Sequence, residues 1–184
     1  ECVADKPISY YAFEMLYWTG LREGELLALT PADFNFEKKT LRVNKSYQRL
    51  EGKDVITDPK TPKSNRTIVM PDFLTIEMED FIKSIYGIKM DDRIFTISKS
   101  YLHHEMDRGA KLAGVKRIRI HGLRHSHISL LINLGFSALA IGERVGHEAV
   151  DITYHYAHLF PTVQTDMAAQ LETEREALVN VRKE

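Results

Sequence analysis

The sequence predicts a mixed α+β domain that is mainly helical and carries a small three-stranded antiparallel sheet. Apolar residues recur at helical spacing from residue 8 to residue 29 and again from residue 71 onward. Between these regions, residues 40 to 70 form short runs with strand-like alternation, separated by turns. A length of 184 residues with 43% apolar content fits one globular domain, with or without a tail.

Two helices are expected at the start of the chain, over residues 8 to 18 and residues 21 to 29. Thr19-Gly20 separates them, and Thr30-Pro31 ends the second. Arg22 and Glu25 lie three residues apart at the start of the second helix. This spacing fits a surface ion pair, and it equally fits an arginine that projects over a cleft.

The central region predicts the sheet. Residues 34 to 39 are expected to form a loop, and the chain then offers three strands, at Thr40–Tyr47, Asp54–Thr57 and Arg66–Met70. Residues 60 to 64, Lys-Thr-Pro-Lys-Ser, predict a basic turn before the third strand. Its two lysines, Lys60 and Lys63, are either solubilising charges or groups that enter a DNA groove.

The second half of the chain predicts a series of helices. The first covers residues 71 to 85, with Phe73, Ile76, Phe81 and Ile85 expected on its apolar face. Ser98 or Ser100 and Ser137 are expected to cap later helices, and Gly114, Gly135 and Gly146 to end them. The expected spans are residues 98 to 112, 122 to 134, 138 to 145, 151 to 158 and 162 to 182.

Composition narrows the functional classes. No apolar run approaches the roughly 20 residues of a membrane helix, and the chain does not open on an export signal. One cysteine, Cys2, fits a reducing compartment, so a cytoplasmic protein is expected. The sequence has neither a Gly-rich phosphate loop nor a Gly-x-Ser-x-Gly nucleophile turn, which disfavours NTP-driven enzymes and serine hydrolases.

Positive charge is concentrated in two blocks although the formal net charge is −1. Residues 42 to 66 hold seven Lys/Arg against three Asp/Glu, and residues 103 to 127 hold six against two. Such blocks indicate either scattered solvated charge or one electropositive face for nucleic acid. The candidate DNA contacts within them are Lys63, Arg66, Arg117 and Arg119.

The segment from His121 to Tyr156 carries the residue types that phosphate chemistry requires. His121 and Arg124 share a helical face, where a guanidinium can grip phosphate oxygens and an imidazole can move a proton. A tyrosine hydroxyl downstream is a potential nucleophile. His121 and His125 have the spacing of a zinc helix, but Arg124 between them would repel a dication, so no metal is expected. The two helices around Gly135 also resemble a helix-turn-helix, which would indicate a DNA-binding module without catalysis.

These motifs together resemble the catalytic domain of the tyrosine recombinases, the phage-type integrases. Residues 19 to 26, Thr-Gly-Leu-Arg-Glu-Gly-Glu-Leu, resemble the first arginine box, and residues 121 to 126, His-Gly-Leu-Arg-His-Ser, resemble the second. Residues 145 to 147, Val-Gly-His, resemble the Gly-His element, and Tyr156 follows nine residues after His147. Lys60 stands in the turn where the family has its catalytic lysine.

The resemblance implies a role for each of these residues. Arg22 and Arg124 would bind the scissile phosphate, Lys60 would protonate the leaving 5′-oxygen, and His121 would serve in proton transfer. His147 would hydrogen-bond the phosphate, and Tyr156 would form the 3′-phosphotyrosyl link. Glu25 would support the site, unless it is only a surface residue. Tyr154, on the opposite side of its helix from Tyr156, is expected to be a packing aromatic.

The resemblance further implies site-specific recombination of double-stranded DNA without cofactor, metal or membrane, as in the integration or excision of mobile DNA of a bacterium or phage. A tetramer on DNA is expected, with residues 161 to 184 docking in trans and the family's N-terminal DNA-binding domain lying outside residues 1 to 184. A type IB topoisomerase and a non-catalytic helix-turn-helix protein remain as alternatives.

Overall fold

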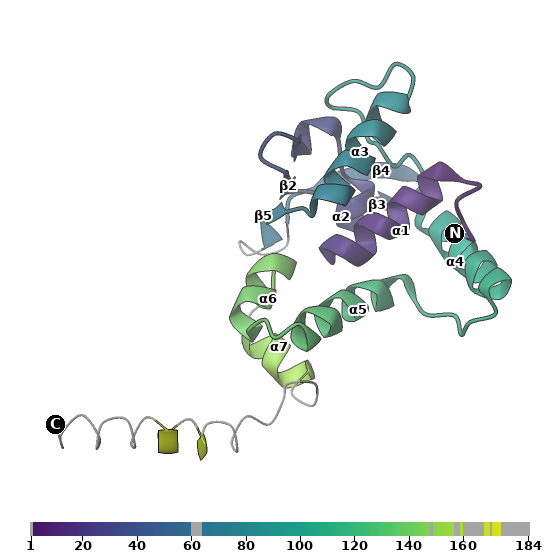
Figure 1. Cartoon of the computed structure of the whole chain (residues 1–184). Helices are drawn as coiled ribbons and strands as arrows, with labels where there is room; N and C mark the ends of the chain where they lie inside the picture. The colour runs from purple at the N-terminus through teal and green to yellow at the C-terminus, as the bar shows by residue number, and fades with distance from the viewer. Residues whose placement is uncertain are drawn as a thin grey trace.

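The computed structural model of the chain describes residues 2–59, 64–147, 149–156, 159, 168–169 and 171–173. Figure 1 shows the order of the elements. The helices are α1 (Pro7–Thr19), α2 (Glu23–Leu27), α3 (Asp72–Ser84), α4 (Lys99–Ala113), α5 (Ile120–Asn133), α6 (Ala138–Val145) and α7 (Ala149–Tyr156), with a 3-10 turn at Pro31–Asp33. The strands are β1 (Phe34–Asn35), β2 (Thr40–Val43), β3 (Ser46–Leu50), β4 (Lys53–Thr57) and β5 (Arg66–Val69). The predicted class, mainly helical with a small antiparallel sheet, is confirmed.

The apolar side chains form two clusters. The larger joins α1, α2, the sheet, α3 and α4, and includes Met15, Leu26, Leu41 and Phe95, all essentially inaccessible to solvent. The smaller lies among α5, α6 and α7. In Figure 1 these three helices form the lower part of the molecule, below α1 and β5.

Gly20 makes the turn between α1 and α2 possible. Its φ is +66°, a left-handed conformation that glycine adopts without a steric penalty. A Cβ at this position would lie 2.6 Å from Cδ2 of His127 on α5, closer than packing allows. The bare backbone therefore lets α5 approach the turn that leads directly to Arg22.

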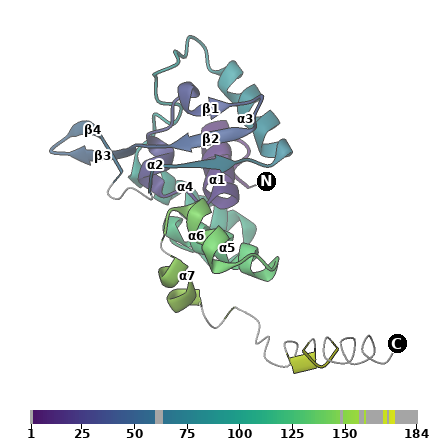
Figure 2. The same cartoon turned by 90° about the vertical axis from the view of Figure 1, so that its left-hand side faces the viewer.

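The strands are arranged differently from the prediction. The three-stranded sheet has the order β1-β2-β5, and β3 and β4 form a separate antiparallel hairpin that projects from the domain (Figure 2). The expected loop at residues 34 to 39 contributes β1, because Phe34 packs into the larger core. The expected strand at residues 40 to 47 is split, since Lys45 leaves the sheet to form an ion pair with Asp33 at 2.6 Å.

Helix α3 packs against the core with Phe81 and Ile85, as expected, but not with the other two residues predicted on its apolar face. It buries Leu74, Met78 and Phe81, which lie four and three residues apart. Phe73 is 42% exposed and Ile76 60% exposed, so the prediction was wrong for both. Phe73 contacts the edge of Trp18, with ring centroids 5.2 Å apart, at the margin of the core.

The helices after α3 follow the sequence closely. Ser98 caps α4 and Ser137 caps α6, each accepting a hydrogen bond from a backbone N–H three residues later. Gly114 and Gly146 end these helices in the left-handed conformation. The predicted helix over residues 162 to 182 falls almost entirely outside the described residues. None of the described helices is long and apolar enough to cross a membrane.

Candidate active site

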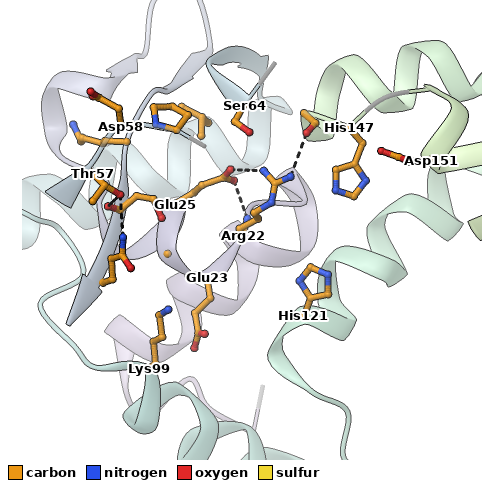
Figure 3. A pocket seen from close by; sticks show the side chains of 17 residues that line it. Arg22, Glu23, Glu25, Thr57, Asp58, Ser64, Lys99, His121, His147 and Asp151 are labelled. Carbon is orange, nitrogen blue, oxygen red and sulfur yellow. Dashed lines mark hydrogen bonds and ion pairs between the residues drawn. The ribbon is translucent and has the colours of Figure 1, made fainter. Parts of the chain in front are cut away.

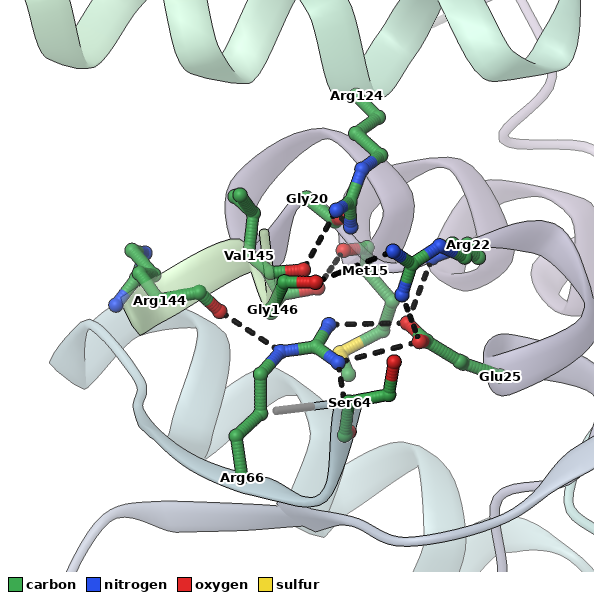
Figure 4. Close-up of polar contacts among 11 residues, drawn as sticks. Met15, Gly20, Arg22, Glu25, Ser64, Arg66, Arg124, Arg144, Val145 and Gly146 are labelled. Carbon is green, nitrogen blue, oxygen red and sulfur yellow. Dashed lines mark hydrogen bonds and ion pairs between the residues drawn. The ribbon is translucent and has the colours of Figure 1, made fainter. Parts of the chain in front are cut away.

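The carboxyl-terminal end of α6 gathers three arginine side chains that are far apart in the sequence (Figure 4). Three consecutive carbonyls each accept one hydrogen bond: Arg144 from Arg66 Nε at 2.8 Å, Val145 from Arg124 at 2.6 Å, and Gly146 from Arg22 at 3.2 Å. Carbonyls at a helix end lack partners within the helix and carry partial negative charge. The end of α6 therefore fixes the positions of three cations.

Glu25 is the counter-ion of this cluster. Its side chain is buried, and its carboxylate accepts from Arg22 at 2.8 Å and from Arg66 at 2.9 and 3.1 Å. Burial alone would raise the pKa of Glu25, but the hydrogen bonds and charge of Arg66, followed by those of Arg22, hold it below its usual value. The carboxylate is thus ionised and orients both guanidinium groups.

Arg124 lies at the inner side of the cluster. It extends from α5, is 1% exposed, and donates to the carbonyls of Gly20 and Val145. Burial, followed by the charge of Arg22, lowers its pKa to about 9, so it remains charged at pH 7. Its buried Nε has no hydrogen-bond partner among the described residues. An unpaired buried donor is unfavourable by roughly 1–3 kcal/mol, which an anion at this point would offset.

A pocket of about 640 Å³ opens beside the cluster (Figure 3). Arg22 projects into it from the position just before α2, His121 from the first turn of α5, and His147 from the turn after α6. Pro59 and Ser64 also line it. The remaining charged lining residues are Glu23, Glu25, Lys45, Asp58, Lys99 and Asp151.

The imidazoles of the pocket are neutral at pH 7. Burial, followed by the charges of Arg124 and Arg22, lowers the pKa of His147 to about 4. The same causes, together with His125, lower the pKa of His121. Among the described residues, no group of three or more His, Cys, Asp or Glu side chains is placed to hold a metal ion. The pocket therefore presents the charge of Arg22 and neutral imidazole N–H groups to a ligand, beside the carboxyl groups of Glu23, Asp58 and Asp151.

Tyr156 and Tyr154 lie on opposite faces of α7. Tyr156 is 8% exposed, packs in the smaller core, and shares a hydrogen bond with Nδ1 of His125. It does not line the pocket. Tyr154 is 82% exposed, so the expectation that it packs in the interior was wrong. The divergence of the two side chains follows from the helical geometry.

The candidate DNA contacts have different environments. Arg66 was expected to contact DNA, but the structure buries its guanidinium against Glu25, Arg144 and Ser64, where it cannot reach a duplex. Arg117 and Arg119 are exposed just before α5, and Arg117 forms an ion pair with Asp107. Lys60 and Lys63 lie outside the described residues.

Sequence reasoning missed two contributors to this site. Arg144 donates to His127, to Val69 and to Trp18, and so joins α6 to β5 and to the end of α1. No local pattern distinguishes Arg144 from a surface arginine on α6. His125 was considered only as a partner of His121 for zinc, and its contact with Tyr156 is 31 residues away in the sequence. Its helical spacing from His121 was the one available signal.

Replacing Glu25 with Gln should destabilise the protein strongly. The change leaves Arg66, whose side chain is 5% exposed, without its anion, and removing one partner of a buried pair typically costs about 3–5 kcal/mol. Urea unfolding at pH 7 measures the loss. Glu79→Gln is the matched control, because the Glu79–Lys83 pair is largely exposed and should contribute roughly 0.5 kcal/mol or less.

The effect of Glu25→Gln should also depend on pH. Because the folded pKa of Glu25 is depressed, its stabilising contribution is present above the unfolded value near 4.3 and is lost as pH falls through the folded value. The difference between wild type and variant should therefore shrink in acid. A difference that stays constant down to pH 3, or equals that of Glu79→Gln, contradicts the role given to Glu25.

The comparisons with known proteins agree with this geometry. The phage integrase family model matches residues 3–162. The ICEBs1 integrase of Bacillus subtilis is 33% identical over 174 residues, which cover 87% of this chain and 47% of that protein. The integrase of Staphylococcus phage L54a is 30% identical, over 88% of this chain and 51% of that protein. The chain thus spans about half the length of these curated relatives.

Solved structures show the same fold. The Tn1549 transposon integrase in complex with transposon right end DNA superposes with a TM-score of 0.70 at 25% identity, covering 92% of this chain and 59% of that one. The XerA recombinase superposes with a TM-score of 0.68 at 20% identity, covering 92% and 60%. Since the family model spans most of the sequence and the fold agrees, this chain belongs to the phage integrase family.

Proposed function

We propose that this chain is the catalytic part of a site-specific recombinase that cleaves and rejoins double-stranded DNA through a 3′-phosphotyrosyl link at Tyr156. The observation that carries the proposal is the convergence of Arg22 and Arg124 on adjacent carbonyls, beside the pocket that holds His121 and His147. The similarity to integrases from a bacterium and a phage supports action on mobile DNA. The related transposon integrase bound to DNA supports a DNA substrate.

The pocket provides the electrostatics that phosphodiester transfer needs. Attack on phosphorus adds negative charge to the non-bridging oxygens, and preorganised cations stabilise that charge. Arg22, whose side chain is 35% exposed, can reach the phosphate directly. Arg124 is buried beside the pocket and supplies positive charge, and its Nε has no hydrogen-bond partner among the described residues. His147 donates from its neutral ring, and no rearrangement of charge is needed before the phosphate binds.

Tyr156 is the proposed nucleophile. Its oxygen forms a bond to phosphorus while the bond from phosphorus to the 5′-oxygen breaks, and Lys60 protonates the departing oxygen. Lys60 is outside the described residues, but its described neighbours Pro59 and Ser64 both line the pocket. The phosphotyrosyl ester retains the energy of the broken bond, so the 5′-hydroxyl can restore the strand without ATP.

Tyr156→Phe should abolish covalent capture of DNA, whereas Tyr154→Phe should leave it intact, because Tyr154 is exposed on the far face of α7. The probe is a pool of duplexes with randomised sequence around a nick, so that the short downstream piece diffuses away after cleavage. Denaturing gels measure the covalent adduct of the full 184-residue chain. Sequencing the captured strands identifies the preferred site.

Three outcomes would contradict parts of this proposal. Loss of the adduct in Tyr154→Phe but not in Tyr156→Phe reassigns the nucleophile. Relaxation of supercoiled plasmids without any site preference identifies a type IB topoisomerase activity instead. Binding of the duplexes without any adduct identifies a non-catalytic DNA-binding protein.

We also propose that the chain assembles as a tetramer on two duplexes, with residues 161 to 184 docking on a neighbour. Deleting residues 162 to 184 should then lower the mass of the DNA complex measured by light scattering while leaving the thermal unfolding midpoint within about 3 °C. A truncated chain that unfolds well below wild type places these residues in their own core and contradicts docking in trans.

A further inference from the structure

The phenol of Tyr156 already has a partner that can take its proton. His125 stands one turn after His121 on α5, and their rings meet edge to face with centroids 4.8 Å apart. The ring centroids of His125 and Tyr156 lie 5.9 Å apart, and the phenol oxygen shares a hydrogen bond with Nδ1 of His125. His125 therefore connects the proposed nucleophile to an imidazole of the pocket wall.

The direction of this hydrogen bond follows from what each group has available. Tyr156 is buried, and among the described residues no other group forms a hydrogen bond with its hydroxyl. The arrangement that satisfies the phenol proton has O–H donating to Nδ1, with the ring proton of His125 on Nε2. His125 itself is exposed, so protons can pass between its ring and solvent.

The charges around the pair favour a neutral acceptor and a protonated donor. Partial burial, followed by the charges of Arg124 and His155, lowers the pKa of His125, which is therefore unprotonated at pH 7. Burial raises the pKa of Tyr156, and the charge of Arg124 only partly opposes this. The phenol does not ionise by itself at neutral pH, so attack on phosphorus needs a base.

We propose that His125, and not His121 as the resemblance implied, is the general base that activates Tyr156. The inference rests on the proposed function. As the Tyr156 oxygen bonds to phosphorus, its proton passes to Nδ1 of His125, and the 5′-oxygen leaves with a proton from Lys60. On rejoining, the 5′-hydroxyl attacks phosphorus and its proton passes to the neutral amine of Lys60, while the imidazolium returns its proton to the departing phenolate. Negative charge on the reacting phosphate offsets the repulsion between the imidazolium and Arg124.

The test compares His125→Gln with wild type in single-turnover formation of the covalent adduct. The DNA is the site recovered from the nicked pool, prepared with either oxygen or sulfur at the bridging 5′-position. Loss of a general base typically slows a reaction by roughly 10²–10⁴-fold, and this loss is expected with both DNAs. Lys60→Ala should be slow only on the oxygen DNA, because a thiolate leaves without a proton. His104→Gln, an exposed histidine on α4, is the matched control and should react like wild type.

The pH profile of the rate and chemical rescue with imidazole distinguish two roles for His125: accepting the proton of Tyr156, or only holding Tyr156 in place. The wild-type rate should fall in acid as His125 becomes protonated, at a pH below the usual range for histidine because burial and the charge of Arg124 lower its pKa. This pH dependence of the rate should vanish in His125→Gln. The groups facing His125 are His121, Arg124, His155 and Tyr156, which remain in both proteins. Added imidazole should restore adduct formation in His125→Ala. The restored rate should increase with the concentration of the neutral form of imidazole, which is the form that can accept a proton.

A His125→Gln variant that reacts as fast as wild type, or faster, overturns the inference. The hydrogen bond would then hold the Tyr156 hydroxyl in its resting position without accepting its proton during the reaction. A defect that disappears on the sulfur DNA also overturns it, because His125 would then serve the leaving group. If His125→Gln does not fold, as judged by circular dichroism, the imidazole rescue of His125→Ala decides. If wild type forms no adduct at all, the proposed function itself is refuted. This result differs from the outcomes above, in which wild type reacts and only the role of His125 is contradicted.

Discussion

The end of α6 is the constraint on which the rest of the structure depends. A helix of eight residues leaves carbonyls without internal partners, and here three arginines from β5, α5 and the start of α2 satisfy them. Each arginine thereby ties a different part of the chain to the same point. Without Gly20 at the end of α1, α5 could not approach closely enough for Arg124 to take part. Fold and site are consequently held by the same hydrogen bonds.

The cluster contains more positive than negative charge, and this excess defines what the site accepts. Glu25 neutralises part of the charge of Arg22 and Arg66, while Arg124 has no carboxylate partner among the described residues. The nearby imidazoles are kept neutral by burial and by these arginines, so the protein does not add to the repulsion. An anion bound against Arg22, where this cluster meets the pocket, therefore relieves an electrostatic imbalance within the cluster, as expected of a preorganised phosphate site.

The sequence predicted those features whose determining residues lie close together along the chain. The boxes around Arg22 and Arg124 were identified by their resemblance to the family, and the ends of helices α4 and α6 by their Ser and Gly residues. The two-residue strand β1 is too short to show alternation, and the faces of α3 depend on packing rather than periodicity. Arg66 was misplaced because its burial depends on Glu25, 41 residues away, and a strand pattern cannot show a tertiary partner. The same reason hid the contact between His125 and Tyr156.

The most direct test of the account is the pKa of His147, followed by NMR with and without inorganic phosphate. In the free protein this pKa is held at about 4 by burial and by Arg124 and Arg22. A phosphate bound against the same arginines must stabilise the imidazolium, so the pKa should rise by at least one unit and the rise should be lost in Arg22→Ala. A pKa of His147 that stays unchanged at saturating phosphate, or rises equally in Arg22→Ala, would contradict the claim that the end of α6 organises an anion site.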